Sequence, residues 1–134
     1  MARRNKLLKF SELLTFPNVY ENYEVTNALL VASQDDQVEM ANKWKKEHFK
    51  NDNPITLELA CGRGEYSLAL AERYPERNFI GVDAKGARIW KGAQIATAKG
   101  LDNVAFLRTR IEFCHLFFGK NEIDEIWITF PDPF

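Results

Sequence analysis

Two kinds of hydrophobic periodicity alternate along the chain from residue 55 onward. Four short runs rich in β-branched and aromatic residues are typical of buried strands, and they cover residues 55–60, 78–83, 103–108 and 124–130. Three segments between them carry apolar residues at helical spacing: 64–74, 85–100 and 111–118. Because strands and helices alternate at this spacing, we expect an α/β fold with a parallel sheet and helices on both of its faces.

The first 53 residues follow a less regular pattern. We expect an extended or turn segment around Pro17 and a surface helix over residues 34–49, where polar residues surround scattered apolar ones. The sequence KNDNP at 50–54 then predicts a turn. We therefore divide the chain into residues 1–53, an N-terminal extension with a helix, and residues 54–134, the regular α/β part.

Composition limits the class of protein. The 134 residues are 46% hydrophobic and 28% charged, which is typical of one globular domain. The net charge of −1 gives no overall field that attracts nucleic acid. A local basic cluster stands at the start of the chain: Arg3, Arg4, Lys6 and Lys9. It is either a solvated tail or a binding arm.

No targeting or metal-binding pattern is evident. The opening residues lack the apolar core of a signal peptide, and no run is long enough to span a bilayer. Cys61 and Cys114 lie far apart without a partner motif, which indicates neither a zinc site nor a disulfide framework. We therefore expect a cytoplasmic protein without a bound metal.

The turn after the first regular strand carries the first candidate chemistry. Gly62 and Gly64 allow a tight turn and a close approach of a ligand to the following helix. Glu58 lies near the end of this strand, and Asp83 ends the next strand, 19 residues after Gly64, where an acid commonly binds ribose hydroxyls. Two structural alternatives remain open: Asp83 as a helix cap, and Glu58 as a carboxylate satisfied by amides of the glycine turn.

The identity of the nucleoside cofactor follows from two residues of the turn. A dinucleotide fingerprint requires a third glycine where this chain has Ser67. Glu65 stands at the helix start, where its carboxylate repels a pyrophosphate. S-adenosylmethionine contains adenosine without a phosphate, and its cationic groups tolerate nearby acids. The electrostatics therefore favour S-adenosylmethionine over a nicotinamide dinucleotide.

Three segments of the sequence together resemble the bacterial tRNA (guanine-N7)-methyltransferase family. They are LELACGRGEYSLALAERYP at 57–75, NFIGVDAKGAR at 78–88 and FPDP at 130–133, and the likeness extends to KFSELLTFPNVY at 9–20. The resemblance implies a Rossmann-like class I methyltransferase sheet with strand order 3-2-1-4 that is truncated after the fourth strand, so that residues 54–134 form the N-terminal half of the domain. It also implies methyl transfer from S-adenosylmethionine to N7 of guanine 46 in the variable loop of tRNA.

The resemblance also assigns cofactor contacts. Glu58 and Asp83 match cofactor-contacting acids of the family, and Gly62 and Gly64 match its glycine turn. The segment RTRIE at 108–112 matches the part that lies against the adenine. Arg110 replaces the acid that is frequent in the family there, so we expect Ile111 or backbone amides to make this contact. Ala60 stands where many class I enzymes have glycine.

Asp132 matches the acid that the family uses in catalysis or in guanine binding. Pro131 and Pro133 fix φ on both sides of it, so its carboxylate has little conformational freedom to lose. Guanine N7 carries a lone pair and no proton, and alkylation there requires alignment more than a strong base. Asp132 would orient the guanine and offset the positive charge that develops on it. A plain turn that ends the strand is the alternative.

Other ionisable and aromatic residues are weaker candidates. We expect Lys85 and Arg88 either to meet tRNA phosphates or to be ordinary surface charges. Trp90 either packs in the core or flanks the cofactor. We expect His48 to be exposed and His115 to be a core or boundary residue. Trp44 and Trp127 are expected to pack rather than to stack on bases.

Three other functions compete with this interpretation. The sequence DPF at 132–134 leaves open an exocyclic-amine nucleic-acid methyltransferase, Ser67 and Glu65 disfavour a nicotinamide oxidoreductase, and a cofactor- or tRNA-binding module without catalysis is the third. The strand at 124–130 is apolar on both faces and would form an open sheet edge. We therefore expect the chain to be a fragment, to bind tRNA weakly, to methylate it poorly, and to have this edge covered by another chain or by further residues.

Overall fold

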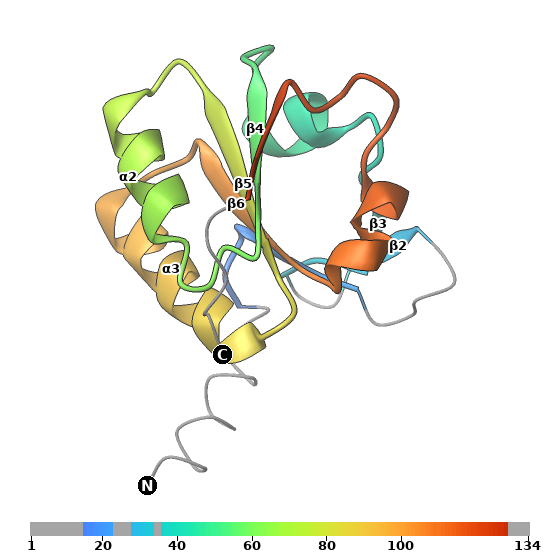
Figure 1. Ribbon diagram of the computed structural model, residues 1–134, viewed down its shortest axis with the longest axis horizontal. Helices are drawn as coiled ribbons and strands as arrows, with labels where there is room; N and C mark the ends of the chain where they lie inside the picture. Colours follow the sequence, from blue (N-terminus) through green and yellow to red (C-terminus); the bar gives the residue numbers. More distant parts are fainter. Residues whose placement is uncertain (1–14, 23–27, 34–35, 129–134) are drawn as a thin grey trace, which may run out of the picture.

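A single mixed β-sheet organises the part of the chain that the computed structural model describes, residues 15–22, 28–33 and 36–128. Its strand order is β3-β2-β1-β6-β5-β4-β7 (Figure 1). Each strand is short: β1 Val19–Glu21, β2 Leu29–Val31, β3 Gln37–Glu39, β4 Ile55–Leu59, β5 Asn78–Asp83, β6 Val104–Arg108 and β7 Glu125–Ile128. No helix in the described ranges has the length and apolarity to cross a membrane.

The four strands expected from the apolar runs form the parallel half of this sheet. They pair in the order β6-β5-β4-β7, which confirms the expected order of third, second, first and fourth strand. β5 is buried along its whole length, as a central strand with both faces covered should be. All four carboxyl ends therefore lie along one side of the sheet, called its carboxyl edge below, and the four amino ends lie along the opposite side, called its amino edge. Both are distinct from the open edge formed by an outermost strand.

Helices cover both faces, as expected. α2 (Glu65–Arg73) and α3 (Gly86–Lys99) pack on one face, over a core that includes Phe79, Ile89 and Phe106. η2 (Trp44–Phe49) and the 3₁₀ helix η3 (Ile111–Phe117) lie on the other, visible on the opposite side of the sheet in Figure 1. Their core includes Tyr20, Trp44 and Leu107.

The N-terminal part has the expected turn around Pro17, followed by β1, but it differs from the expected structure in its helix. A surface helix over residues 34–49 is wrong, because Gln37–Glu39 pair with β2 as strand β3 and only Trp44–Phe49 are helical. Asn42 adopts a left-handed conformation with φ of 66°, which interrupts a continuous helix. Trp44 is fully buried and its Nε1 donates to the Phe117 carbonyl at 2.8 Å, so this helix is anchored in the core rather than on the surface.

His48 is half-buried, so the expectation that it is exposed is also wrong. Its Nδ1 lies 2.6 Å from the hydroxyl of Tyr20 on β1. Burial, followed by the charge of Lys50, lowers the pKa of His48 to about 4, and burial raises the pKa of Tyr20 to about 12. The pair is therefore a neutral polar contact within the core.

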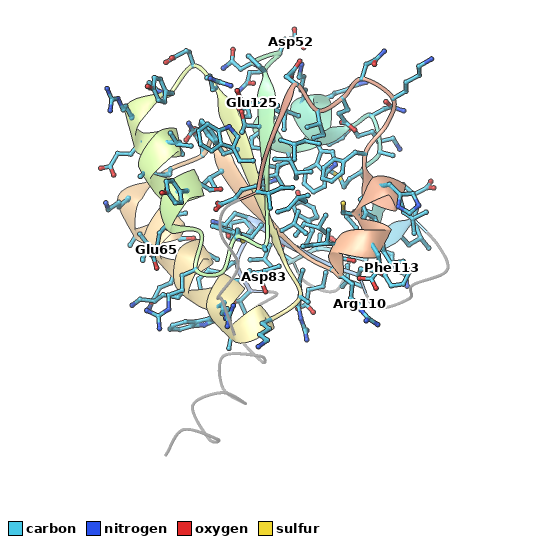
Figure 2. All side chains as sticks on the ribbon, viewed as in Figure 1. Asp52, Glu65, Asp83, Arg110, Phe113 and Glu125 are labelled. Carbon is cyan, nitrogen blue, oxygen red and sulfur yellow. The ribbon has the colours of Figure 1, made fainter. Side chains whose placement is uncertain are left out.

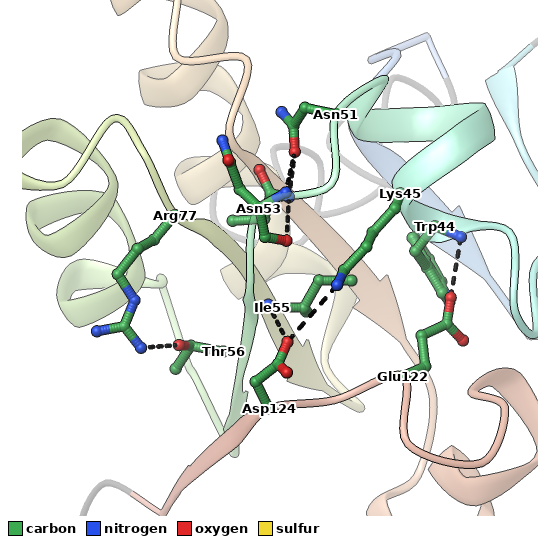
Figure 3. A network of polar contacts seen from close by, with 10 residues as sticks. Trp44, Lys45, Asn51, Asn53, Ile55, Thr56, Arg77, Glu122 and Asp124 are labelled. Atoms are coloured by element: carbon green, nitrogen blue, oxygen red, sulfur yellow. Dashed lines mark hydrogen bonds and ion pairs between the residues drawn. The ribbon is translucent and has the colours of Figure 1, made fainter.

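Hydrogen bonds to two carboxylates connect the elements at the amino edge of the sheet, as Figure 3 shows. The buried Glu122 carboxylate accepts hydrogen bonds from the backbone amides of Asn42, Trp44 and Gly119, at 2.7, 3.0 and 2.8 Å. Asp124 accepts from the Ile55 amide at 2.8 Å. Glu122 thus connects the segment before β7 to η2, and Asp124 connects it to β4. Both contacts lie at the end of the sheet opposite the predicted site.

Among the described residues, the strand β7 forms one edge of the sheet and pairs only with β4. Its side chains Ile126, Trp127 and Ile128 are 58%, 43% and 72% exposed. The expected open edge is therefore present in the described part of the chain. An apolar edge with unpaired backbone groups is a surface on which a further strand can pair.

Candidate active site

The turn between β4 and α2 has the backbone shape that its glycines predict. Ala60, Gly62 and Gly64 have φ of 57°, 60° and 72°, all in the left-handed region. A Cβ on Gly64 would lie 2.5 Å from Cε1 of the buried Phe106 ring, so a side chain does not fit there without displacement. Gly64 thus permits both the turn and the close packing of this turn on the sheet.

Asp83 connects this turn to the next strand. One carboxylate oxygen, Oδ2, accepts from the Gly62 amide at 2.8 Å, and Oδ1 accepts from the Lys85 amide at 2.8 Å. Asp83 is only 7% exposed. It is not the N-cap residue of α3, which is Lys85, so the helix-cap alternative does not describe its position. Each oxygen keeps a lone pair for a ligand hydroxyl.

Glu58 lies beneath the start of α2, next to Ser67. It is 4% exposed, and Oε1 accepts from the hydroxyl of Ser67 at 2.7 Å. The donor to this oxygen is therefore a side-chain hydroxyl, whereas the structural alternative for Glu58 expected backbone amides of the glycine turn. Ser67 stands where a dinucleotide fingerprint has its third glycine, so the same substitution that disfavours that cofactor also holds Glu58.

The third strand brings Arg110 and Ile111 to the same edge of the sheet. Arg110 precedes η3 and is exposed, with Nη2 at 3.5 Å from Oε2 of Glu112. Ile111 is 42% exposed. Figure 2 shows Asp83 and Arg110 at one end of the molecule and Asp52 and Glu125 at the other. The apolar side chain of Ile111 is therefore available to a ligand that reaches beyond Asp83.

The remaining candidates divide between surface and core. Lys85 and Arg88 are exposed at the start of α3. Trp90 packs edge-on against Phe16, with ring centroids 6.5 Å apart, so the packing alternative describes its contacts. His115 is exposed, and its expected place in the core or at its boundary is wrong.

Asp132, with Pro131 and Pro133, lies outside the described residues. Among the residues that are described, no group of three or more His, Cys, Asp or Glu side chains could hold a metal ion.

Sequence reasoning missed a buried thiol inside the turn. Cys61 is 7% exposed, and burial, together with the charges of Glu58 and Asp83, raises its pKa well above the usual range. A Cβ on Gly81 would lie 2.9 Å from Sγ of Cys61, so the thiol fills the space under the turn. The protonated thiol acts as a small apolar filler. No motif around Cys61 indicates this role.

The geometry limits what the site can bind. A left-handed turn, a buried carboxylate bonded to the turn and an exposed apolar residue at the third strand suit a nucleoside that lies along the carboxyl edge of the sheet. Glu65 is exposed at the first position of α2, where a phosphate would otherwise bind. Strand order and turn together define a Rossmann-like sheet with a site for a nucleoside cofactor at its carboxyl edge.

Comparison with known proteins leads to a family. The family described as "Putative methyltransferase" matches residues 52–134. The chain belongs to this methyltransferase family. A solved structure of WbdD shares the fold, with a TM-score of 0.50 and 22% identity over 66% of this chain and 19% of that one.

Curated relatives confirm the resemblance noted in the sequence. A tRNA (guanine-N(7)-)-methyltransferase of Christiangramia forsetii is 50% identical over 99% of this chain and 57% of its own length. One of Bacteroides fragilis is 50% identical over 97% of this chain and 49% of its own length. The chain thus spans about half the length of the curated relatives it matches.

Proposed function

We propose that this chain holds S-adenosylmethionine for methyl transfer to N7 of a guanine in the variable loop of tRNA. The observation that carries the proposal is the Asp83 carboxylate, bonded to Gly62 of the left-handed turn at the carboxyl edge of the sheet. The relatives named tRNA (guanine-N(7)-)-methyltransferase support the choice of substrate.

The residues at the edge fit the cofactor. Asp83 would accept hydrogen bonds from the ribose hydroxyls, with its orientation already fixed by two backbone amides. Amides of the turn at Gly62 and Gly64 would border the amino-acid part of the ligand, and Glu58 would add negative potential beneath it. Ile111 would cover one face of the adenine, because it is the exposed apolar side chain that follows the third strand.

The chemistry requires alignment more than proton transfer. S-adenosylmethionine supplies an electrophilic methyl group on a sulfonium sulfur. Asp132 would grip the donor edge of the guanine so that its N7 lone pair points along the line of attack. The same carboxylate would offset the positive charge that forms on the purine. Asp132 would therefore contribute in the transition state, without taking up a proton.

Exposed cations beside the site suit the tRNA backbone. Lys85 and Arg88 stand at the start of α3 beside the Asp83 turn, and no described residue forms an ion pair with either of them. We propose that they contact tRNA phosphates, which would make tRNA binding sensitive to salt. Because tRNA modification of this kind takes place where tRNA is handled, we place the protein in the cytoplasm.

Transfer of a labelled methyl group to tRNA tests the proposal, with a complete enzyme that carries these residues. Borohydride and aniline cleave RNA at N7-methylguanine, and they leave an alkylated exocyclic amine intact. Cleavage at one variable-loop guanine is the expected result. Label without cleavage would indicate an exocyclic-amine methyltransferase, and cofactor binding without any transfer would indicate a binding module.

We further propose that the β7 edge pairs with a second copy of the chain. The exposed Ile126, Trp127 and Ile128 support this, because an apolar edge strand is a template for strand addition. Light scattering of the 134-residue chain should show a dimer. Ile126→Lys, which places a charge on the edge, should shift the population to monomer, and a monomer at high concentration for the unmodified chain would contradict the proposal.

A further inference from the structure

The N-terminal strand β1 ends beside the cofactor edge. It pairs in parallel with β6, with Glu21 opposite Arg108, and Arg108 in turn lies opposite Asp83 on β5. Because parallel strands present their carboxyl ends at one edge, residues from the N-terminal extension reach the end of the sheet where Asp83 lies. These three charged residues form a row across three neighbouring strands.

The alternation of side chains places this row on the face covered by α3. Val19 and Phe106, two residues before Glu21 and Arg108, belong to the core on that face. Side chains two residues apart on a strand share a face, so Glu21 and Arg108 point to the same side. Arg108 therefore lies between the N-terminal strand and the start of α3.

Two contacts connect Arg108 to groups on either side. Its Nη1 lies 2.8 Å from Oε2 of Glu21, whose side chain is only 4% exposed. Its Nε donates to the carbonyl of Ala84 at 3.4 Å. Ala84 is the residue between Asp83 and Lys85, so one guanidinium links a buried carboxylate of the N-terminal strand to the turn that holds the ribose-binding acid.

The turn at 83–85 is fixed by hydrogen bonds on both sides of Ala84. The Asp83 carbonyl accepts from the Thr109 amide at 3.1 Å, and the Asp83 side chain accepts from the Lys85 amide. Arg108 adds a bond to the carbonyl between them. A binding carboxylate must be held to a fraction of an ångström to be effective, and such precision requires supporting contacts of this kind.

We infer that Arg108, held by Glu21, is a positioning residue for Asp83, and that the N-terminal strand is thereby part of the cofactor site. This inference rests on the proposed function. In this role Arg108 acts on Asp83 through the Ala84 carbonyl and not by direct contact with the cofactor. Loss of the contact should weaken cofactor binding and leave the chemical step unchanged.

Arg108→Lys separates positioning from stability. Lysine keeps a positive charge for Glu21, but its single ammonium group cannot also replace the Nε bond to Ala84. In the 134-residue chain, we expect calorimetry to show a rise in the Kd for S-adenosylhomocysteine of about 3- to 10-fold, the scale of one hydrogen bond. The melting temperature should change little. In a complete enzyme the KM for S-adenosylmethionine should rise while kcat at saturation stays the same.

The matched control is Lys99→Gln. It breaks another ion pair, Lys99–Glu72 at 3.1 Å, which is half-exposed and lies at the end of α3, away from the site. Its Kd should equal that of the unmodified chain. All affinities are measured well below the lowest melting temperature, so a less stable variant is still tested.

The outcomes are distinguishable. An unchanged Kd in Arg108→Lys, with normal binding by the unmodified chain, would overturn the inference and leave the proposed function intact. An equal loss in the Lys99→Gln control would also overturn it, because the effect would then be general. Absence of binding by the unmodified chain would instead contradict the proposed function.

Discussion

Asp83 is the residue on which the proposed cofactor site depends most. Its two carboxylate oxygens already accept from Gly62 and Lys85, so the side chain is oriented before any ligand arrives. A preorganised acceptor loses little conformational entropy when it binds hydroxyl groups. The strength of cofactor binding should therefore depend on this one carboxylate.

Replacing Asp83 with alanine should weaken the binding of S-adenosylmethionine by about 1.5–3 kcal/mol, because hydrogen bonds to a charged acceptor are lost. Isothermal calorimetry on the 134-residue chain measures this directly. Asp102→Ala is the control, since Asp102 is exposed and follows α3 at the opposite edge of the sheet. Unchanged affinity in Asp83→Ala would remove Asp83 from the site.

Ala60 carries a backbone strain that glycine would relieve. Its φ of 57° lies in the left-handed region, which a Cβ disfavours. Ala60→Gly should raise the free energy of unfolding by about 0.5–1 kcal/mol, the strain relieved less the greater chain entropy of glycine in the unfolded state. Urea denaturation gives the value. A decrease in stability would mean that the Ala60 methyl group contributes more by packing than its conformation costs.

Single residues of the site were predictable to different degrees. The positions of Gly62, Gly64 and Asp83 at one turn could be predicted because turn chemistry and a strand-end acid leave a local pattern. Cys61 and Arg108 were not, because their roles depend on what packs against them, and a local pattern does not show that. The structure does not test the assignment of Asp132, which stays a prediction.

At the scale of elements, Glu122 fastens the helix η2 to the segment that leads into β7. Three backbone amides share its carboxylate. Glutamine cannot reproduce this arrangement, because its NH₂ group is a donor where an acceptor is needed. Glu122→Gln should therefore lower the free energy of unfolding by about 1–3 kcal/mol.

Chemical denaturation of this variant is compared with Glu76→Gln, an exposed glutamate before β5. The control should change stability little, because substitutions at exposed positions usually have small effects. Equal stabilities for the two variants would show that the Glu122 contacts contribute nothing.

The contact between β1 and η2 predicts a loss of stability in acid. The pKa of His48 is about 4 in the folded chain, below its usual value of 6.5, because the charged form is disfavoured by burial. The unfolded chain therefore binds the proton more readily, and the stabilising contribution is full above pH 6.5 and is lost as the pH falls toward 4.

Urea denaturation at a series of pH values measures this effect. His48→Gln, which keeps a polar partner for Tyr20 without a titrating ring, should show a flatter dependence between pH 6.5 and 4. The same slope in both proteins would show that other groups cause the acid sensitivity.

The elements from residue 55 onward could be predicted because their period is clear and their strands are buried. The helix at 85–100 ends at Gly100, whose left-handed φ of 67° the sequence indicated. The N-terminal strands could not be predicted. β1, β2 and β3 have three residues each, too few to show alternation. Their structure depends on pairing between strands, of β1 with β6, β2 with β1 and β3 with β2.

At the scale of the whole molecule, the structural contacts and the proposed cofactor site lie at opposite edges of the sheet. The amino edge carries structural ties such as Glu122 and Asp124, and the carboxyl edge carries the glycine turn and Asp83. Strands from residues 1–53 and from 54–134 lie in the same sheet, and they meet at the pairing of β1 with β6. The N-terminal extension thus stabilises the edge at which the cofactor is proposed to bind.

The proposed roles also separate cofactor binding, assigned to Asp83, from catalysis, assigned to Asp132. Asp132→Asn, in a complete enzyme, should lower kcat far more than it weakens S-adenosylmethionine binding, because an orienting acid acts on the guanine in the transition state. Steady-state kinetics with tRNA and calorimetry with the cofactor give the two quantities. Equal losses in both would make Asp132 a cofactor ligand.

The central claim is that this carboxyl edge binds S-adenosylmethionine and rejects a dinucleotide. Calorimetric titration of the 134-residue chain with S-adenosylmethionine and, separately, with NADH tests it most directly. The account predicts saturable binding of S-adenosylmethionine and no measurable binding of NADH, because Glu65 repels a pyrophosphate and Ser67 replaces the third glycine. Tight binding of NADH without binding of S-adenosylmethionine would contradict it.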